Sequence, residues 1–355
     1  MINKKQYFLN AHIIDPCNAI NEIGGLIIDE KGNIEASGKR VNKNNIPTRE
    51  KYTDLTGKHI FPGVVDMRVF GGEPGYEYKE NYRTLSEAAL AGGITSVVTM
   101  PNTNPVIDSV SIVDFIQRRG RDKSKINIFP TATLTKDAEG TNMCEFGLLK
   151  NKGIVGFTDG IKSIQSPRVM SRIIKSAYDF DCLIMQHAED AELSKDGMIN
   201  DGIISTKLGI PGISDLAEKI IIERDLSLLE ETNCRYHISQ ISSRKSLDLI
   251  NYKKDIVNFT TGVSINNLAL NENDIGEFRT FLKLSPPLRT EDDRMSLIDG
   301  INKNLIDVIV SDHKPEDEES KRLTFSQAAT GASGIETLLS LALEQFHNGS
   351  IKLEK

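Results

Sequence analysis

Two patterns of hydrophobic and polar positions divide the chain. Before residue 59, short apolar runs are separated by turn signals such as Asp15-Pro16 and Lys31-Gly32-Asn33, which is typical of a small β-structure. From residue 59 onward, apolar runs alternate with segments of helical period, which predicts strands followed by helices. We therefore expect a small β-element over residues 1–58, an α/β domain over 59–347 and a short C-terminal tail over 348–355.

The periodicity also places the individual elements. In the β-element it predicts strands at residues 7–14, 25–29 and 34–37. In the α/β domain it predicts eight strands, at residues 60–66, 95–100, 126–133, 154–157, 182–187, 235–241, 257–263 and 307–311. Helices are expected between most of them, at residues 85–90, 109–119, 167–179, 215–232, 243–253, 291–302 and 335–345. Eight strand–helix units predict a (β/α)₈ barrel of the TIM type.

Composition narrows the class of protein. The 355 residues carry a net charge of −7 without a long basic run, so we expect neither nucleic acid nor membrane as a partner. The four cysteines are far apart and form no CxxC pair, which suits a reducing compartment. The N-terminus lacks the apolar core of a signal peptide, and no apolar run is long enough to span a bilayer. We expect a cytoplasmic protein.

Candidate chemistry gathers where predicted strands end, which is where barrel enzymes hold their active sites. The first barrel strand ends in Asp66-Met67-Arg68-Val69-Phe70, and a glycine-rich loop over residues 71–75 follows it. Further polar residues follow other strands, namely Asn102, Asp159, His187, Gln240 and Asp312.

These segments resemble the dihydroorotase family of metal-dependent amidohydrolases, over about residues 5–345. The matching motifs are Glu73-Pro74-Gly75, Met100-Pro101-Asn102-Thr103-Asn104-Pro105, His187-Ala188-Glu189-Asp190, Pro286-Pro287-Leu288-Arg289 and Asp312-His313. The resemblance implies a barrel of the amidohydrolase kind, preceded here by an incomplete β-sandwich. It also implies two metals held by four histidines and two carboxylates.

The metal ligands that the resemblance implies are mostly replaced. The two histidines of the first strand are Arg68 and Phe70, which offer no lone pair to a metal. The strand-six ligand is Gln240, and two further family positions are Gly72 and Glu316. The resemblance implies a vestigial set of retained site positions. The metal positions are His187, Asp159 and Asp312, and Asp312 is also the family's catalytic residue. The substrate position is Asn102. Whether the bridging carboxylate is Asp159 or is lost at Gly160 stays open.

Three functions fit these residues. The resemblance favours a non-catalytic dihydroorotase-like subunit of pyrimidine biosynthesis, without a cofactor, that assembles with the aspartate transcarbamoylase catalytic chain as an oligomer. The alternative is an active or re-purposed dihydroorotase or cyclic amidohydrolase with one zinc, held by His187, Asp312 and either His237 or His313. The third is a regulatory module in which Arg68 and Arg289 bind an anion. The plainest interpretation of Arg68 is an ion pair with Asp66, Asp159 or Asp312.

Overall fold

The chain divides into two units between Gly63 and Val64. The structure is a computed structural model, and it describes residues 4–353. The division falls later than the expected boundary at residue 58, because His59–Ile60 form a short strand that pairs within the first unit. The last two residues of the expected C-terminal tail, 354–355, lie outside the described residues. The described part of that tail includes Ile351, which is buried in the core of the second unit.

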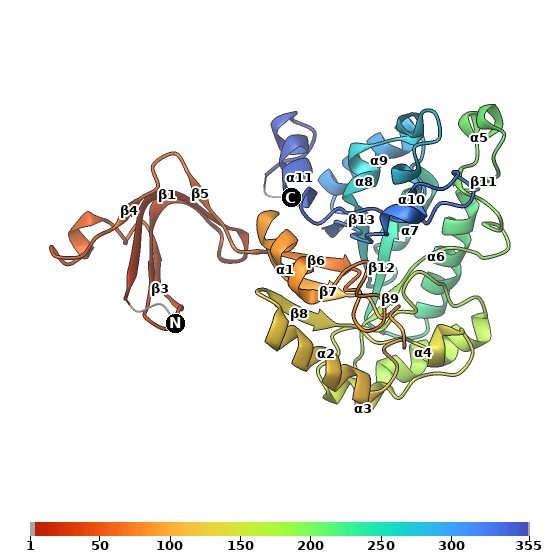
Figure 1. The fold of residues 1–355 in the computed structure, drawn as a ribbon, viewed down its shortest axis with the longest axis horizontal. Coiled ribbons are helices and arrows are strands. Elements are labelled where there is room, and N and C mark those ends of the chain that lie inside the picture. The colour runs from red at the N-terminus through yellow and green to blue at the C-terminus, as the bar shows by residue number, and fades with distance from the viewer. Residues whose placement is uncertain (1–3, 354–355) are drawn as a thin grey trace. The chain divides into compact units, whose positions relative to one another are not determined.

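The first unit contains one five-stranded sheet of order β3-β2-β1-β4, with β5 also paired to β1 (Figure 1). Strand β2 runs antiparallel to both β1 and β3, whereas β4 and β5 run parallel to β1. Over residues 4–63 the expected partial sandwich is therefore a single layer. Its strands are β1 (Gln6–Asp15), β2 (Ile20–Ile28), β3 (Ile34–Gly38), β4 (Thr53–Asp54) and β5 (His59–Ile60), with 3₁₀ turns at Pro16–Asn18 and Lys43–Asn45.

The second unit is built on parallel strands in two sheets, of order β6-β7-β8 and β14-β13-β12-β9. Isolated parallel bridges connect the sheets: Phe157 pairs with Ala132 and Ile184, and Val69 pairs with His313. The strands are β6 (Val64–Val69), β7 (Ile94–Thr99), β8 (Asn127–Pro130), β9 (Ile184–Gln186), β12 (Tyr236–Ile241), β13 (Thr260–Ser264) and β14 (Val308–Val310), with a small pair β10 (Ile199–Asn200) and β11 (Gly212–Ile213).

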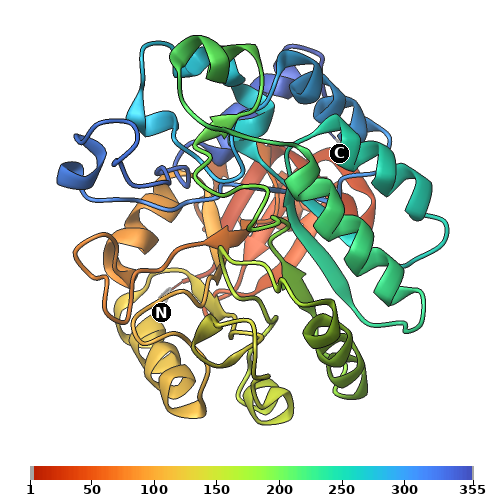
Figure 2. The same cartoon turned by 90° about the vertical axis from the view of Figure 1, so that its right-hand side faces the viewer.

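Helices surround the strands of this unit, and a continuous apolar core fills the space between the two layers (Figure 2). The helices are α1 (Tyr82–Ala91), α2 (Val110–Lys123), α3 (Phe146–Asn151), α4 (Pro167–Asp179), α5 (Ile203–Leu208), α6 (Leu216–Leu229), α7 (Arg244–Lys253), α8 (Ile265–Ala269), α9 (Glu291–Asn302), α10 (Glu318–Lys321) and α11 (Leu338–His347), with 3₁₀ turns at Lys136–Ala138, Glu272–Ile275 and Thr280–Leu282. Within the described residues, no helix is long and apolar enough to cross a membrane.

Two of the predicted strands are wrong. The run at residues 60–66 is broken at Pro62-Gly63, because proline cannot donate to a strand ladder, so β5 ends at Ile60 and β6 begins at Val64. The run at residues 154–157 contributes one bridging residue, Phe157, rather than a strand. The helices α4 and α9 have the predicted bounds, since Ser166 and Thr290 cap their first turns as the sequence pattern requires.

A buried carboxylate joins the first and last strands of the second unit. Asp66 in β6 is fully buried, and its Oδ1 accepts hydrogen bonds from the backbone N–H of Ser311 at 3.3 Å and of Arg68 at 3.2 Å. Burial raises the pKa of Asp66 from 3.8 to about 6, against the opposing effect of these hydrogen bonds. Asp66 therefore takes up a proton more readily in the folded state than in the unfolded chain.

This shift predicts a pH dependence of stability. Because the folded pKa lies above the unfolded one, the contribution of Asp66 is most favourable at low pH and is lost as pH rises through about 6. Replacing Asp66 by Asn removes the titration. We expect the free energy of unfolding of the variant, relative to the wild type, to rise by roughly 1 kcal/mol between pH 5 and pH 7.5, measured by urea denaturation. Asp248→Asn, at an exposed position in α7, is the control. Parallel pH profiles for wild type and D66N would contradict the assignment.

Candidate functional site

An ion pair lies at the carboxyl end of β6. The Arg68 side chain is 4% exposed, and its Nε donates to Oδ1 of Asp312 at 3.0 Å. Burial raises the pKa of Asp312 above its usual value, and the charge and hydrogen bond of Arg68 oppose that rise. Of the three carboxylates that the sequence offered to Arg68, the structure selects Asp312. A guanidinium therefore contacts directly the carboxylate that the family resemblance implies as the catalytic residue.

The other replaced positions of this segment are filled by packing. Phe70 is buried, and its ring centroid lies 6.0 Å from that of Tyr76. Gly72 has φ +72°, and a Cβ built there would lie 1.9 Å from the carbonyl oxygen of Glu80. No side chain fits at residue 72 without moving the loop. Glu73 accepts from the N–H of Tyr82 at 3.0 Å and from Nε of Arg119 at 2.6 Å, so this motif residue shapes the loop.

Asp159 is fully engaged by its neighbours. Its Oδ1 accepts from the N–H groups of Leu134 and Thr135 at 2.8 and 3.0 Å, and its Oδ2 accepts from the Thr135 hydroxyl at 2.5 Å. The next residue, Gly160, has φ +76°, and a Cβ there would lie 3.1 Å from Cβ of Asn102. The carboxylate thus holds the segment after β8, while the alternative bridging position has no side chain. Asn102 faces this glycine, with Oδ1 buried and without a hydrogen-bond partner.

The histidines considered as ligands point to separate partners. His187 Nε2 lies 3.6 Å from a Glu189 carboxylate oxygen and 3.5 Å from the Ser285 hydroxyl. His313 Nε2 lies 3.1 Å from Glu80, and its Nδ1 accepts from the N–H of Gly334. The third histidine, His237 of β12, has its Nδ1 2.8 Å from the hydroxyl of Thr260, its register partner in β13.

Charge at His237 is disfavoured as well. Burial lowers the pKa of His237 to about 4. Gln240, at the lost ligand position of β12, donates from Nε2 to the carbonyl oxygen of Ser285 at 3.0 Å. Across residues 4–353, no three His, Cys, Asp or Glu side chains are grouped so that they could hold a metal ion. The residues present at the old metal positions therefore do not fit the pair of metals that the family resemblance implies.

Arg289 does not join Arg68 in an anion site. It donates to neutral acceptors: the Ser242 hydroxyl at 3.1 Å, Oδ1 of Asn200 at 2.9 Å and the carbonyl oxygen of Ile213 at 2.6 Å. These contacts hold the segment at β10 and β11 against β12. The two arginines serve different parts of the unit, so the anion-binding fork expected from the sequence is not assembled.

Sequence reasoning missed a set of lysines that holds the loop at residues 325–331. Lys283 Nζ donates to the carbonyl oxygens of Phe325, Ser326 and Ala328 at 2.9, 3.1 and 2.9 Å. Lys314 and Lys321 donate to the carbonyl oxygens of residues 329–331, at 2.6 to 2.8 Å. Nothing in the local pattern distinguishes these lysines from surface lysines, because their acceptors are backbone carbonyl oxygens, whose position depends on the fold of the loop and not on any side chain.

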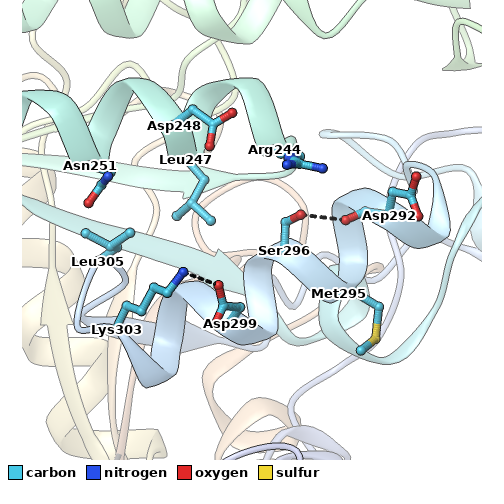
Figure 3. A pocket seen from close by; sticks show the side chains of 10 residues that line it. All are labelled: Arg244, Leu247, Asp248, Asn251, Asp292, Met295, Ser296, Asp299, Lys303 and Leu305. Carbon is cyan, nitrogen blue, oxygen red and sulfur yellow. Dashed lines mark hydrogen bonds and ion pairs between the residues drawn. The ribbon is translucent and has the colours of Figure 1, made fainter.

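One cavity borders the ion pair, and another lies elsewhere in the second unit. The first, of about 250 Å³, lies beside the ion pair and is lined by residues that include Arg68, Asp312, Glu189, Ser285, Lys283 and Lys314. The second, of about 450 Å³, lies between α7 and α9 (Figure 3). Its polar side chains include the pair Lys303–Asp299 at 2.6 Å, and it is lined on one side by Met295. Neither cavity brings together an acid, a base and a metal-ligand set.

Comparisons with known proteins agree with the motifs. The sequence profile of the family described as Dihydro-orotase-like matches residues 57–246. The chain is 38% identical over 350 residues to a dihydroorotase of Ehrlichia canis (strain Jake), covering 98% of this chain and 77% of that protein. It is 39% identical over 354 residues to a dihydroorotase of Wolbachia sp. subsp. Brugia malayi (strain TRS), covering 99% and 79%.

A solved structure extends the similarity to the fold. The L-hydantoinase (dihydropyrimidinase) from Arthrobacter aurescens superposes with a TM-score of 0.85 at 20% sequence identity, covering 100% of this chain and 79% of that one. At this identity the superposition supports the amidohydrolase-like α/β fold alone. The profile and the relatives settle the family: the chain belongs to the dihydroorotase-like family.

Proposed function

We propose that this chain is a non-catalytic member of the dihydroorotase-like family, retained for its surface rather than for turnover. The observation that carries the proposal is the ion pair of Arg68 with Asp312, 3.0 Å apart. Arg68 stands at a metal-ligand position of the family and brings a permanent positive charge to the carboxylate that would bind the metal. Without a metal, no water is activated as a nucleophile and no amide carbonyl is polarised.

The same proposal includes the architecture. Parallel pairings run from β6 through β7 and β8, continue through Phe157 to β9, and proceed through β12 and β13 to β14. The bridge between His313 and Val69 returns the path to β6. We propose that these segments form one closed (β/α)₈ barrel in which the ion pair lies at the carboxyl end of the strands. The partner would be the aspartate transcarbamoylase catalytic chain of pyrimidine biosynthesis, in a cytoplasmic oligomer.

An active cyclic amidohydrolase with one zinc is the alternative. It needs a third ligand beside His187 and Asp312. His237 and His313 lie against Thr260 and Glu80 instead. The observation in favour of this candidate is the 38–39% identity to relatives named dihydroorotase.

The first prediction concerns metal and activity. We expect the purified, tag-free chain to retain far less than one zinc per chain after dialysis, measured by plasma emission spectrometry. We also expect no interconversion of carbamoyl aspartate and dihydroorotate, with or without added zinc. An active dihydroorotase assayed in parallel is the control. One zinc per chain that disappears in His187→Ala would revive the mononuclear enzyme.

A second prediction isolates the ion pair by a double-mutant cycle. Arg68→Met leaves the Asp312 carboxylate buried without its partner, so we expect the free energy of unfolding to fall by about 3–5 kcal/mol. Asp312→Asn added to R68M should recover part of this loss, since it removes the unpaired charge. Lys303→Met, which breaks the exposed pair with Asp299, is the matched control and should cost less than about 1 kcal/mol. Additive losses at Arg68 and Asp312 would show that the pair is not coupled.

A third prediction concerns the partner. Mixed with the aspartate transcarbamoylase catalytic chain of the same organism at micromolar concentration, the chain should co-elute in size-exclusion chromatography as a stoichiometric complex. Asp312→Asn should leave this association unchanged, because assembly does not use the old catalytic position. Separate elution of the two chains would contradict the proposed assembly role. It would not contradict the proposal that the chain is non-catalytic.

A further inference from the structure

A pair of histidines lies on the sheet of the first unit. His12 of β1 and His59 of β5 are register partners in parallel strands, so their side chains leave the same face of the sheet. Their ring centroids are 4.9 Å apart and the ring planes are tilted by 39°. Asn21 of β2 brings its Oδ1 to 2.6 Å from Nε2 of His12. Two imidazoles and an amide oxygen, from three different strands, therefore lie close together on this face: the two rings are neighbours, and the amide oxygen meets the ring of His12.

We propose that His12, His59 and Asn21 form a binding site for a late first-row transition-metal dication such as Zn²⁺ or Cu²⁺. Neutral imidazole is a good ligand for both ions. In a tetrahedral zinc site with bonds of about 2.0 Å, two ligand nitrogens lie roughly 3.3 Å apart. The ring centroids are 4.9 Å apart, and we expect rotation about the side-chain torsions to bring one nitrogen of each ring to that separation.

The third ligand requires only a small adjustment. The 2.6 Å between Nε2 of His12 and Oδ1 of Asn21 is a hydrogen-bond distance. It would open by about 0.7 Å when a metal replaces the shared proton. Packing of the two rings against each other would explain why His12 and His59 are neighbours. It would not explain why the amide oxygen of Asn21 also contacts His12. The amide oxygen is the feature that favours a metal site over simple ring packing.

The site is accessible from solvent. His59 and Asn21 are exposed, and His12 is half-buried. Ile23, the register partner of His12 on β2, is 69% exposed, so the sheet face is open at this point. Water would supply the remaining ligands. Only two of the three protein ligands are imidazoles, and the amide oxygen is a weaker ligand. We therefore expect the site to bind its metal reversibly.

The structural effect of such a metal follows from the topology. Strand β5 has two residues and pairs with β1 through His12–His59 and Ile13–Ile60. A metal joined to His12, His59 and Asn21 would connect β1, β5 and β2 directly. Because a ligand that binds the folded state alone stabilises it by mass action, unfolding of this unit should depend on metal concentration.

The test is titration of the tag-free full chain with ZnCl₂ by isothermal calorimetry at pH 7.5. We expect one reversible site. His12→Gln and His59→Gln should each weaken binding by about tenfold or more, since loss of even an outer-shell partner of a metal commonly costs that much. Asn21→Leu should also weaken zinc binding. This variant retains both histidines, so it tests the site even if a histidine variant folds poorly. With CuCl₂, paramagnetic resonance should show coupling to two imidazole nitrogens in the wild type and to one in either histidine variant.

Two controls separate this site from other histidines. His347→Gln removes an exposed histidine beside Phe346, in α11, and should leave binding unchanged. His187→Ala should also leave it unchanged, which distinguishes this site from any residual metal at the old catalytic positions. Absence of binding at millimolar zinc, binding that survives both H12Q and H59Q, or binding that is lost in H187A would each overturn the proposal.

Discussion

A buried guanidinium must be neutralised, and this requirement governs the junction between β6 and β14. Moving a charge out of water costs several kcal/mol unless an opposite charge and hydrogen bonds compensate it. Arg68 is 4% exposed and meets Asp312 at 3.0 Å. Two further contacts lie at the same junction. The Asp66 carboxyl group accepts a hydrogen bond from the N–H of Ser311, and Val69 forms a parallel β-bridge with His313. The charge pair therefore coincides with the backbone contacts that join the first and last strands of the second unit.

Other charged groups of the second unit contact mainly the backbone. Asp159 is held by amide and hydroxyl donors of residues 134–135, and Lys283 is held by three carbonyl oxygens of residues 325–328. A carboxylate or ammonium that is saturated in this way stabilises a loop but has little capacity left for a metal or a substrate.

Family and activity are separate questions for this chain. Identity of 38–39% over nearly the whole length fixes the family and the fold. Activity in a metal-dependent barrel depends on a handful of side chains, and a fold can persist after those residues change. Gly72 illustrates the point, because its backbone conformation and its 1.9 Å approach to the Glu80 carbonyl leave no space for the arginine that the family resemblance places there. In its present conformation, the loop has no room for a side chain at residue 72.

The sequence by itself determined the family, the α/β order and the missing imidazoles at Arg68, Phe70 and Gln240, because the chemistry of a side chain is set by its identity. Helices with local caps, such as α4 and α9, were also predictable. The strand expected at residues 154–157 was not, since a single bridging residue is decided by neighbouring strands rather than by local pattern. Only the tertiary structure decided that Arg68 pairs with Asp312, that Asp159 caps a loop and that His313 faces Glu80. These partners lie 244, 24 and 233 residues apart in the chain, so their contacts follow from how distant segments pack and not from any periodicity within one segment.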